Sequence, residues 1–117
     1  MIFPGAVYEK PVVQALRFHA RFYVHGHQVG GTNPSLVESL GTGNAVLAHD
    51  NAYNRWVAGD AGVYFADESG CARAIERLLI GGDDLVALQN AARARHSAAF
   101  TWDRVLGDYE VLLAGWV

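Results

Sequence analysis

Residues 25–43 read His25-Gly-His-Gln-Val-Gly-Gly-Thr-Asn-Pro-Ser-Leu-Val-Glu-Ser-Leu-Gly-Thr-Gly43 and carry the main fold signal of the chain. The apolar run that precedes them, Phe22-Tyr-Val24, is typical of a short buried strand. Asn33 and Pro34 then mark the start of a helix, because an asparagine side chain can cap the first turn and proline fits the first helical position. Apolar residues recur after them at helical spacing, and glycines follow. The stretch therefore predicts a strand, a glycine-rich loop and a helix.

The predicted loop and helix start form a place where an anion can bind. Backbone N–H groups in the first turn of a helix lack intrahelical acceptors and carry partial positive charge, which stabilises a group such as a diphosphate. Gly30 and Gly31 have no side chains that keep a ligand from the backbone. Glu38 follows about one turn into the helix, where its carboxylate can accept hydrogen bonds from sugar hydroxyls. The residues alone leave an ordinary alternative open, in which the glycines form a turn and Glu38 is a solvated side chain.

Composition places the chain among globular proteins. Its 117 residues suffice for one domain with a buried core, which we expect to span residues 1–117. Hydrophobic residues make up 51% of the chain, which argues against disorder, and a net charge of −3 without a basic cluster gives no support for nucleic-acid binding. The single Cys71 cannot form an internal disulfide and fits a reducing compartment. Because no long apolar stretch or signal peptide is visible, a cytoplasmic protein is predicted.

The rest of the chain alternates short apolar runs with amphipathic stretches. Four strands are predicted, over residues 1–5, 20–24, 45–48 and 62–65. Helical spacing is found over residues 9–18, 52–58, 67–80, 83–96 and 101–114. Strands that alternate with helices predict a mostly parallel sheet with helices on both faces, a Rossmann-like three-layer α/β sandwich. Trp102 and Tyr109, on the last predicted helix, are expected in the core.

Chemically versatile residues gather where the predicted strands end. These ends fall at residues 4–5, 25–31 and 49–54. They meet at one edge of a parallel sheet, which is where such folds bind ligands. His25 and His27 are candidates there for contact with a phosphate or a sugar, and a purely structural role is the alternative. His49 and Asp50 lie near enough to raise the question of a metal site, but no cysteine or further carboxylate completes a credible ligand set, and we expect no metal.

Four polar residues after the third predicted strand allow two interpretations. They can contact ligand hydroxyls or phosphate, or they can cap and turn the chain, and they are Asp50, Asn51, Asn54 and Arg55. The sequence contains no G-x-G-x-x-G dinucleotide fingerprint after a strand, no Walker loop and no nucleophile elbow. The residues thus predict a ligand-binding edge of the sheet without naming the ligand.

Three runs of the chain match, in order, the motifs of a known enzyme family. They are Gly30–Leu40, Gly43–Ala48 and Gly59–Phe65. Together they resemble the donor-binding half of group 1 glycosyltransferases, retaining enzymes with two Rossmann-like domains (GT-B type), and the His-Gly-His…Gly-Gly-Thr-Asn-Pro-Ser-Leu wording is similar to that of rhamnosyltransferase-like members. The resemblance covers nearly the whole chain. It implies the carboxy-terminal part of a GT-B enzyme that transfers a hexosyl group, rhamnosyl being one option, from a nucleotide-diphosphate sugar to a glycan or lipid-linked acceptor.

The resemblance also implies roles for particular residues. Glu38 matches the second of two family glutamates separated by seven residues and would bind the ribose of the nucleotide sugar. The first glutamate falls on Gly30, so this acid is missing. The family loop that holds the diphosphate and the sugar matches backbone amides of this chain, those of Gly31, Thr32, Asn33 and Ser35. The family needs no metal or other cofactor, because the nucleotide sugar is itself the substrate.

Family enzymes have parts that this sequence does not contain, namely an amino-terminal acceptor domain and a basic pair earlier in the donor domain. We therefore expect a fragment with little or no transferase activity alone, whose partners are the nucleotide-diphosphate sugar and the acceptor domain. An acceptor at the membrane surface, with the parent enzyme at the inner membrane face, and self-association through sheet edges are left open. The alternative function is a non-catalytic α/β binding or interaction module derived from the same fold.

Overall fold

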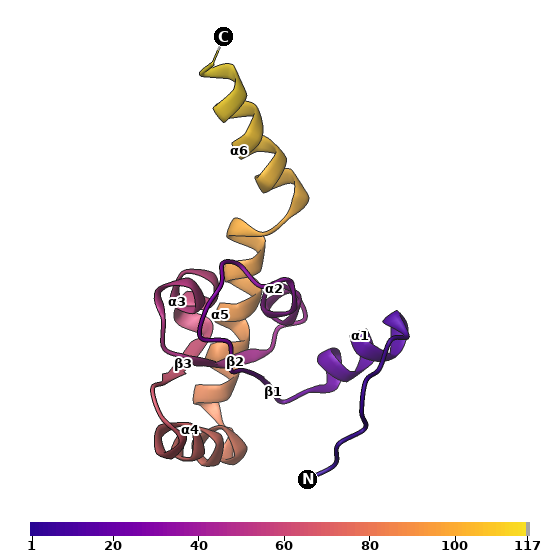
Figure 1. Cartoon of the computed structure of the whole chain (residues 1–117), viewed down its shortest axis with the longest axis vertical. Helices are drawn as coiled ribbons and strands as arrows, with labels where there is room; N and C mark the ends of the chain where they lie inside the picture. Colours follow the sequence, from indigo (N-terminus) through magenta and orange to yellow (C-terminus); the bar gives the residue numbers. More distant parts are fainter. Residues whose placement is uncertain (117) are drawn as a thin grey trace.

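A small parallel sheet lies at the centre of the computed structural model, which describes residues 1–116 (Figure 1). Its strands are β1 (Phe22–His25), β2 (Ala45–His49) and β3 (Gly62–Phe65). They lie side by side in the order β1-β2-β3, and both neighbouring pairs are parallel. The middle strand β2 is buried over its first four residues because both of its faces are covered.

Helices connect and cover the strands. In chain order they are α1 (Lys10–His19), α2 (Pro34–Gly41), α3 (Ala52–Ala58), the 3-10 helix η1 (Gly59–Ala61), α4 (Glu68–Ile80), α5 (Asp83–Ala99) and α6 (Trp102–Ala114). Four helices begin with a side-chain cap that accepts a backbone N–H two or three residues further on, and these caps are Asn33, Asn51, Asp67 and Thr101. The predicted strand, loop and helix over residues 22–41 are confirmed.

Apolar side chains form one core on each face of the sheet. On one face, Val46 and Ala48 of β2 pack with α2 and α3. On the other face, Ala45 and Leu47 pack with α4 and the first half of α5. One strand serves both cores because successive side chains of a strand point to opposite faces. The predicted α/β architecture with helices on both faces is confirmed, and it is compatible with a Rossmann-like fold.

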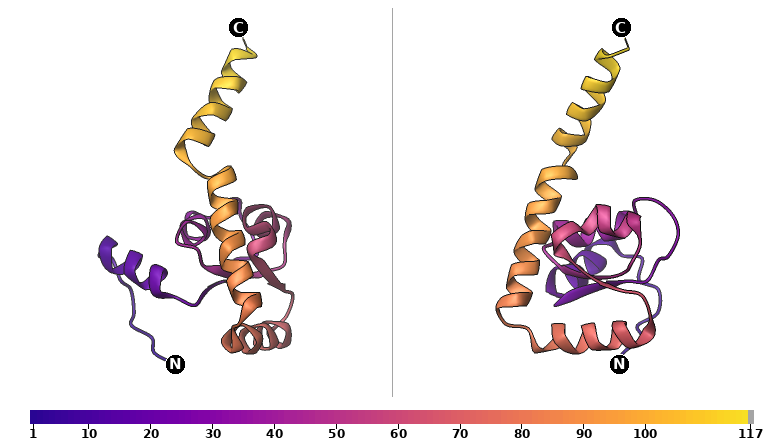
Figure 2. Two further views of the ribbon diagram at one scale, coloured as in Figure 1. Left: turned by 180° about the vertical axis from the view of Figure 1, so that it is seen from behind. Right: turned by 90° about the vertical axis from the view of Figure 1, so that its left-hand side faces the viewer.

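Helix α5 runs along the amino ends of the strands and belongs to both cores (Figure 2). The Gln89 side chain donates a hydrogen bond to the carbonyl oxygen of Arg21, just before β1, at 3.2 Å. The Arg95 side chain donates to the carbonyl oxygen of Val57, shortly before β3, at 3.1 Å. Between these two contacts, Ala92 is fully buried. The carboxyl ends of the strands lie at the opposite edge, away from α5.

The described chain contains three strands, and the prediction of a fourth over residues 1–5 is wrong. Residues 1–9 form neither helix nor strand, and the side chains of Ile2 and Phe3 are 89% and 83% exposed. An extended segment becomes a strand only when its backbone groups pair with a neighbouring strand. No strand of residues 10–116 lies beside this segment, so its apolar character alone did not produce one.

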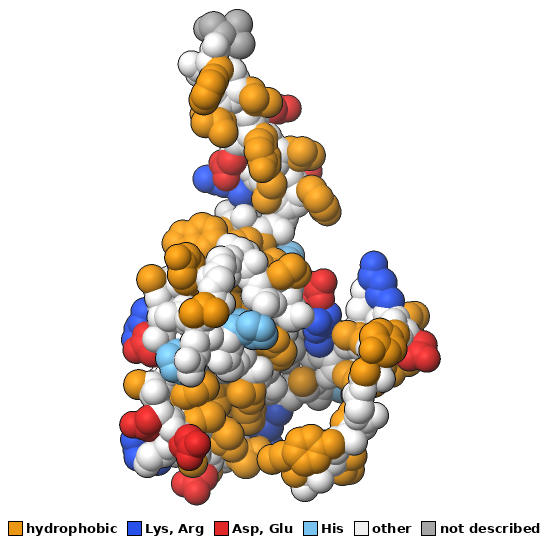
Figure 3. All heavy atoms as spheres, viewed as in Figure 1, with side chains coloured by type: hydrophobic (Ala, Val, Ile, Leu, Met, Phe, Trp, Pro, Cys, Tyr) orange, Lys and Arg blue, Asp and Glu red, His pale blue; other side chains and the backbone are white. Residues whose placement is uncertain are grey.

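Helices α1 and α6 extend away from the body of the molecule (Figures 1 and 2). Neither contains a buried residue, and Figure 3 shows apolar side chains along α6. Trp102 and Tyr109 are 79% and 60% exposed, so the prediction that they lie in the core is wrong. Their spacing identified an amphipathic helix correctly, but such spacing does not say what covers the apolar face. Among residues 1–116, no helix combines the length and apolar character needed to cross a bilayer.

Candidate functional site

A small pocket, which we call the loop pocket, lies at the carboxyl edge of the sheet. It has a volume of about 120 Å³ and is bounded by the loop after β1, the start of α2 and the start of α3. Six of the eight predicted site residues line it, namely His25, His27, Gly30, Gly31, Thr32 and Asn33. The other two, Ser35 and Glu38, are not part of its wall. The structure therefore brings most of the predicted residues to one place, and it separates Glu38 from them.

Two asparagines at the start of α3 fasten the loop to the sheet. Asn51 caps α3, and its Nδ2 donates to the carbonyl oxygen of His27 at 3.1 Å. The Asn54 side chain is buried, and its Nδ2 donates to the carbonyl oxygens of His27 at 3.0 Å and His49 at 2.9 Å. These contacts hold the end of β1 next to the end of β2. The capping and turn interpretation is thus the one that the structure supports for both asparagines.

Among the described residues, the backbone N–H groups without acceptors that lie near the loop pocket belong to the loop rather than to α2. Asn33 Oδ1 accepts the N–H of Ser35 at 2.9 Å, and the Asn33 carbonyl accepts the next two N–H groups of the helix. Pro34 has no N–H to offer. The first turn of α2 is therefore saturated, contrary to our expectation. Within the described chain, the N–H groups of residues 30–32 have no hydrogen-bond acceptor, so they can bind a ligand while the dipole of α2 still favours an anion.

His25 is a buried wall residue of the pocket and is only 2% exposed. The Tyr23 hydroxyl lies 3.3 Å from its Nδ1, and the ring of His27 stacks on its ring with the centroids 4.7 Å apart. Its Nε2 has no hydrogen-bond partner among the described residues. Burial, together with the neighbouring His27, lowers the pKa of His25 below its ordinary value, so its imidazole is neutral at neutral pH.

The lowered pKa of His25 predicts a loss of stability in mild acid. Unfolded His25 regains a pKa of about 6.5, so between that value and the lower folded pKa the unfolded chain binds the extra proton. The stability that neutral His25 contributes to the folded state is fully present above about pH 6.5 and is lost as the pH falls through the folded pKa of His25. Urea unfolding over this range should show a shallower pH dependence for His25→Gln than for the wild type. His19→Gln, on exposed α1, should keep the wild-type dependence, and equal slopes in all three would contradict the prediction.

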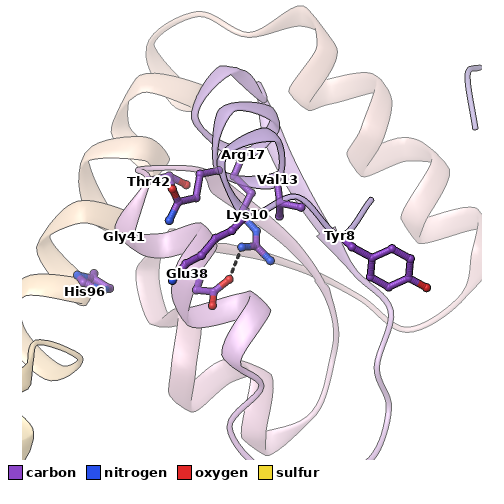
Figure 4. A pocket seen from close by; sticks show the side chains of 9 residues that line it. Tyr8, Lys10, Val13, Arg17, Glu38, Gly41, Thr42 and His96 are labelled. Atoms are coloured by element: carbon purple, nitrogen blue, oxygen red, sulfur yellow. Dashed lines mark hydrogen bonds and ion pairs between the residues drawn. The ribbon is translucent and has the colours of Figure 1, made fainter. Parts of the chain in front are cut away.

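Glu38 lies in a larger hollow of about 560 Å³ between α1 and α2, shown in Figure 4. Its carboxylate forms an ion pair with Arg17 of α1. The Arg17 guanidinium also donates to the hydroxyl of Ser35 at 3.4 Å. The two predicted residues outside the loop pocket therefore share one partner, which sequence reasoning missed. No local pattern points to Arg17, because it precedes Glu38 by 21 residues and lies on a different helix.

Asp50 and Arg55 form an ion pair at the carboxyl edge of the sheet. Arg55 donates to the two Asp50 carboxylate oxygens at 2.5 and 2.8 Å. The hydrogen bonds from Arg55 hold the pKa of Asp50 below its usual range. The Arg55 guanidinium also lies over the Tyr64 ring, 4.4 Å from its centroid. This pair fixes local structure at the start of α3.

The groups that line the loop pocket have the chemistry that suits a small anion. The pocket combines backbone N–H donors without acceptors, two imidazoles and the start of a helix at the open edge of a parallel sheet. No three His, Cys, Asp or Glu side chains in residues 1–116 are grouped so that they could hold a metal ion. Comparisons of the chain with protein families, curated proteins and solved structures found no match. The fold and the site thus define the chain as an α/β protein with a candidate anion pocket.

Proposed function

We propose that the chain is the donor-binding part of a GT-B glycosyltransferase and that the loop pocket holds a phosphate of a nucleotide-diphosphate sugar. The observation that carries the proposal is the row of N–H groups over residues 30–32 beside buried His25, at the edge where α/β sheets bind ligands. The sequence resemblance supplies the identity of the ligand, because the same loop holds the diphosphate in the family. The geometry supports a phosphate ligand independently of that resemblance.

The size of the loop pocket fits one part of such a ligand. At about 120 Å³ it is smaller than the roughly 300–1,000 Å³ of pockets that enclose a whole small molecule. A second hollow of about 430 Å³ lies further along the same edge, between the ends of β2 and β3 and helix α4. Gln28 of the loop and His49 of β2 line this second hollow. A ligand with one phosphate in the loop pocket therefore has room for a second moiety along the edge.

The proposed chemistry of the loop pocket is the stabilisation of a leaving diphosphate. Sugar transfer from a nucleotide sugar releases a nucleoside diphosphate, and negative charge grows on its oxygens as the glycosidic bond breaks. Fixed N–H donors and a helix dipole that face this charge lower the barrier without reorganising. The acceptor is bound elsewhere in the parent enzyme. We expect the purified chain to bind nucleotide without transferring sugar, and sugar transfer by this chain alone would contradict that.

Calorimetric titration with UDP, GDP and dTDP tests the proposal directly. We expect one nucleotide to bind in preference to the others, with inorganic pyrophosphate as a weaker ligand that lacks the nucleoside. If Glu38 also binds the ribose, Glu38→Ala weakens nucleotide binding and leaves pyrophosphate binding unchanged. Arg17→Ala is the matched control, because it breaks the same ion pair and retains the Glu38 carboxylate. Absence of binding to all three nucleotides would overturn the proposal.

A non-catalytic anion-binding module is the second candidate. Two observations favour it: Gly30 stands where the family has its first glutamate, and the Glu38 carboxylate is already paired with Arg17. Such a module would bind pyrophosphate as tightly as any nucleoside diphosphate. The ratio of the two affinities, measured in the same titrations, separates the candidates.

A further inference from the structure

His25, a wall residue of the loop pocket, has a buried nitrogen without a hydrogen-bond partner in residues 1–116. In the described chain, two buried side-chain atoms lack a partner, Nε2 of His25 and Nδ1 of His49, and of these residues His25 alone lines the loop pocket. Buried polar atoms in proteins are nearly always satisfied, and an unsatisfied one calls for a water or a ligand. The stacked neighbour, His27, has an exposed side chain that can change rotamer and give a ligand oxygen access.

Tyr23 can partner both protonation states of His25 through a single contact. Its hydroxyl lies 3.3 Å from His25 Nδ1, and a hydroxyl both donates and accepts hydrogen bonds. In the neutral tautomer that carries its proton on Nε2, the hydroxyl donates to Nδ1. When the imidazole is protonated, Nδ1–H donates to the hydroxyl oxygen. With this tautomer, Nε2–H is the donor on the unpaired side of the ring in both protonation states.

No carboxylate of the described residues sets the charge of His25. The nearby titratable group that acts on the pKa of His25 is His27, which lowers it, as burial does. Two charged groups from neighbouring helices lie near Tyr23, Arg17 of α1 and Glu38 of α2, and they are paired with each other. The residues of α3 and its cap that line the pocket with His25 are the uncharged Asn51 and Asn54. An anion in the loop pocket would therefore be the missing negative partner of a protonated His25.

Building on the proposed function, we propose that phosphate binding in the loop pocket is coupled to uptake of one proton by His25, with Tyr23 as its positioning residue. The proton comes from solvent and binds Nδ1, the Tyr23 hydroxyl turns from donor to acceptor, and Nε2–H donates to a phosphate oxygen. A terminal phosphate has a second ionisation near pH 6 and carries more charge than a doubly esterified phosphate. The pocket thus favours a nucleoside diphosphate, the product of transfer, over the nucleotide sugar.

Calorimetry of UDP, GDP, dTDP and inorganic pyrophosphate near neutral pH, in two buffers of different ionisation enthalpy, counts the protons taken up. We expect the wild type to approach one proton per ligand and His25→Gln to take up none. Tyr23→Phe preserves the ring and should weaken binding about fivefold to tenfold and reduce the proton count, because it removes one hydrogen bond of the protonated state. His27→Gln should raise the His25 pKa and so reduce uptake as well. Nitrogen NMR shifts of the His25 ring report its protonation directly in the wild type and in the two variants that keep His25, and circular dichroism shows that every variant is folded.

The outcomes separate this inference from the proposed function. Nucleotide binding with equal proton uptake in the wild type and His25→Gln overturns the inference and leaves the donor function standing. Proton-coupled binding of pyrophosphate without binding of any nucleoside diphosphate supports the inference and overturns the donor function. Absence of binding by every ligand overturns both. If Tyr23→Phe binds the ligand and takes up protons as the wild type does, Tyr23 has no positioning role.

Discussion

Leu47→Ala is expected to lower the free energy of unfolding by about 2–5 kcal/mol, the largest stability effect that we predict. Leu47 lies on the middle strand β2, is fully buried and packs in the core shared with α4 and α5. Removal of its side chain deletes buried apolar surface and leaves a cavity that close-packed neighbours fill only in part. Urea unfolding followed by circular dichroism measures the loss as a shift of the transition midpoint.

Leu106→Ala is the matched control for this prediction. It makes the same chemical change on α6, where Leu106 is 54% exposed and no residue of the helix is buried. We expect a change within about 0.5 kcal/mol, as is usual for surface substitutions. Similar losses for both variants would mean that the exposed face of α6 contributes to stability in solution, contrary to the structure.

Gly31→Asp should weaken nucleoside diphosphate binding by about a hundredfold or more, the largest effect on binding that we predict. A side chain at this position meets no atom within 4 Å, and the backbone of Gly31 is not in the left-handed region, so the fold accepts it. The new carboxylate, however, lies at the wall of the loop pocket, and a like charge beside a phosphate costs several kcal/mol. Calorimetric titration with the preferred nucleotide measures the loss.

Two controls isolate the charge at Gly31. Gly31→Ala adds the methyl group without the charge and should bind within a few-fold of the wild type. Gly107→Asp adds the same charge on α6, where a side chain also meets no atom within 4 Å, and should leave binding unchanged. Wild-type affinity in Gly31→Asp would place the phosphate somewhere other than the loop pocket.

Local signals in the sequence were sufficient for most of the fold. Three such signals act through neighbours a few residues away, and the structure agrees with each of them. Helix α2 begins after the Asn33 cap, the apolar run over residues 45–48 forms β2, and α4 ends at the glycines that follow it. The failures concern long-range partners. Residues 1–5 look like a strand but have no strand to pair with, and the apolar face of α6 has no cover in the described chain. Periodicity reports which face is apolar, and only tertiary structure reports what meets it.

The candidate site divides in the same way. The glycine loop and its two histidines follow a strand in the sequence, so the rule that parallel strands end at one edge was sufficient to group them. The saturation of α2 by Asn33 was not expected, since the cap had been considered without counting the donors that it uses. The pairing of Glu38 with Arg17 and the contact of Tyr23 with His25 depend on side-chain positions that no sequence motif records.

Helix α5 is joined to the main chain of the sheet layer at two points along its length. Its contacts from Gln89 to the main chain before β1 and from Arg95 to the main chain before β3 are six residues apart, which corresponds to a rise of about 9 Å along the helix. One residue inserted between Gln89 and Arg95 would turn the second contact by about 100° around the helix axis. The two contacts therefore constrain the number of residues between Gln89 and Arg95, in addition to the constraint that burial of Ala92 places on side-chain size.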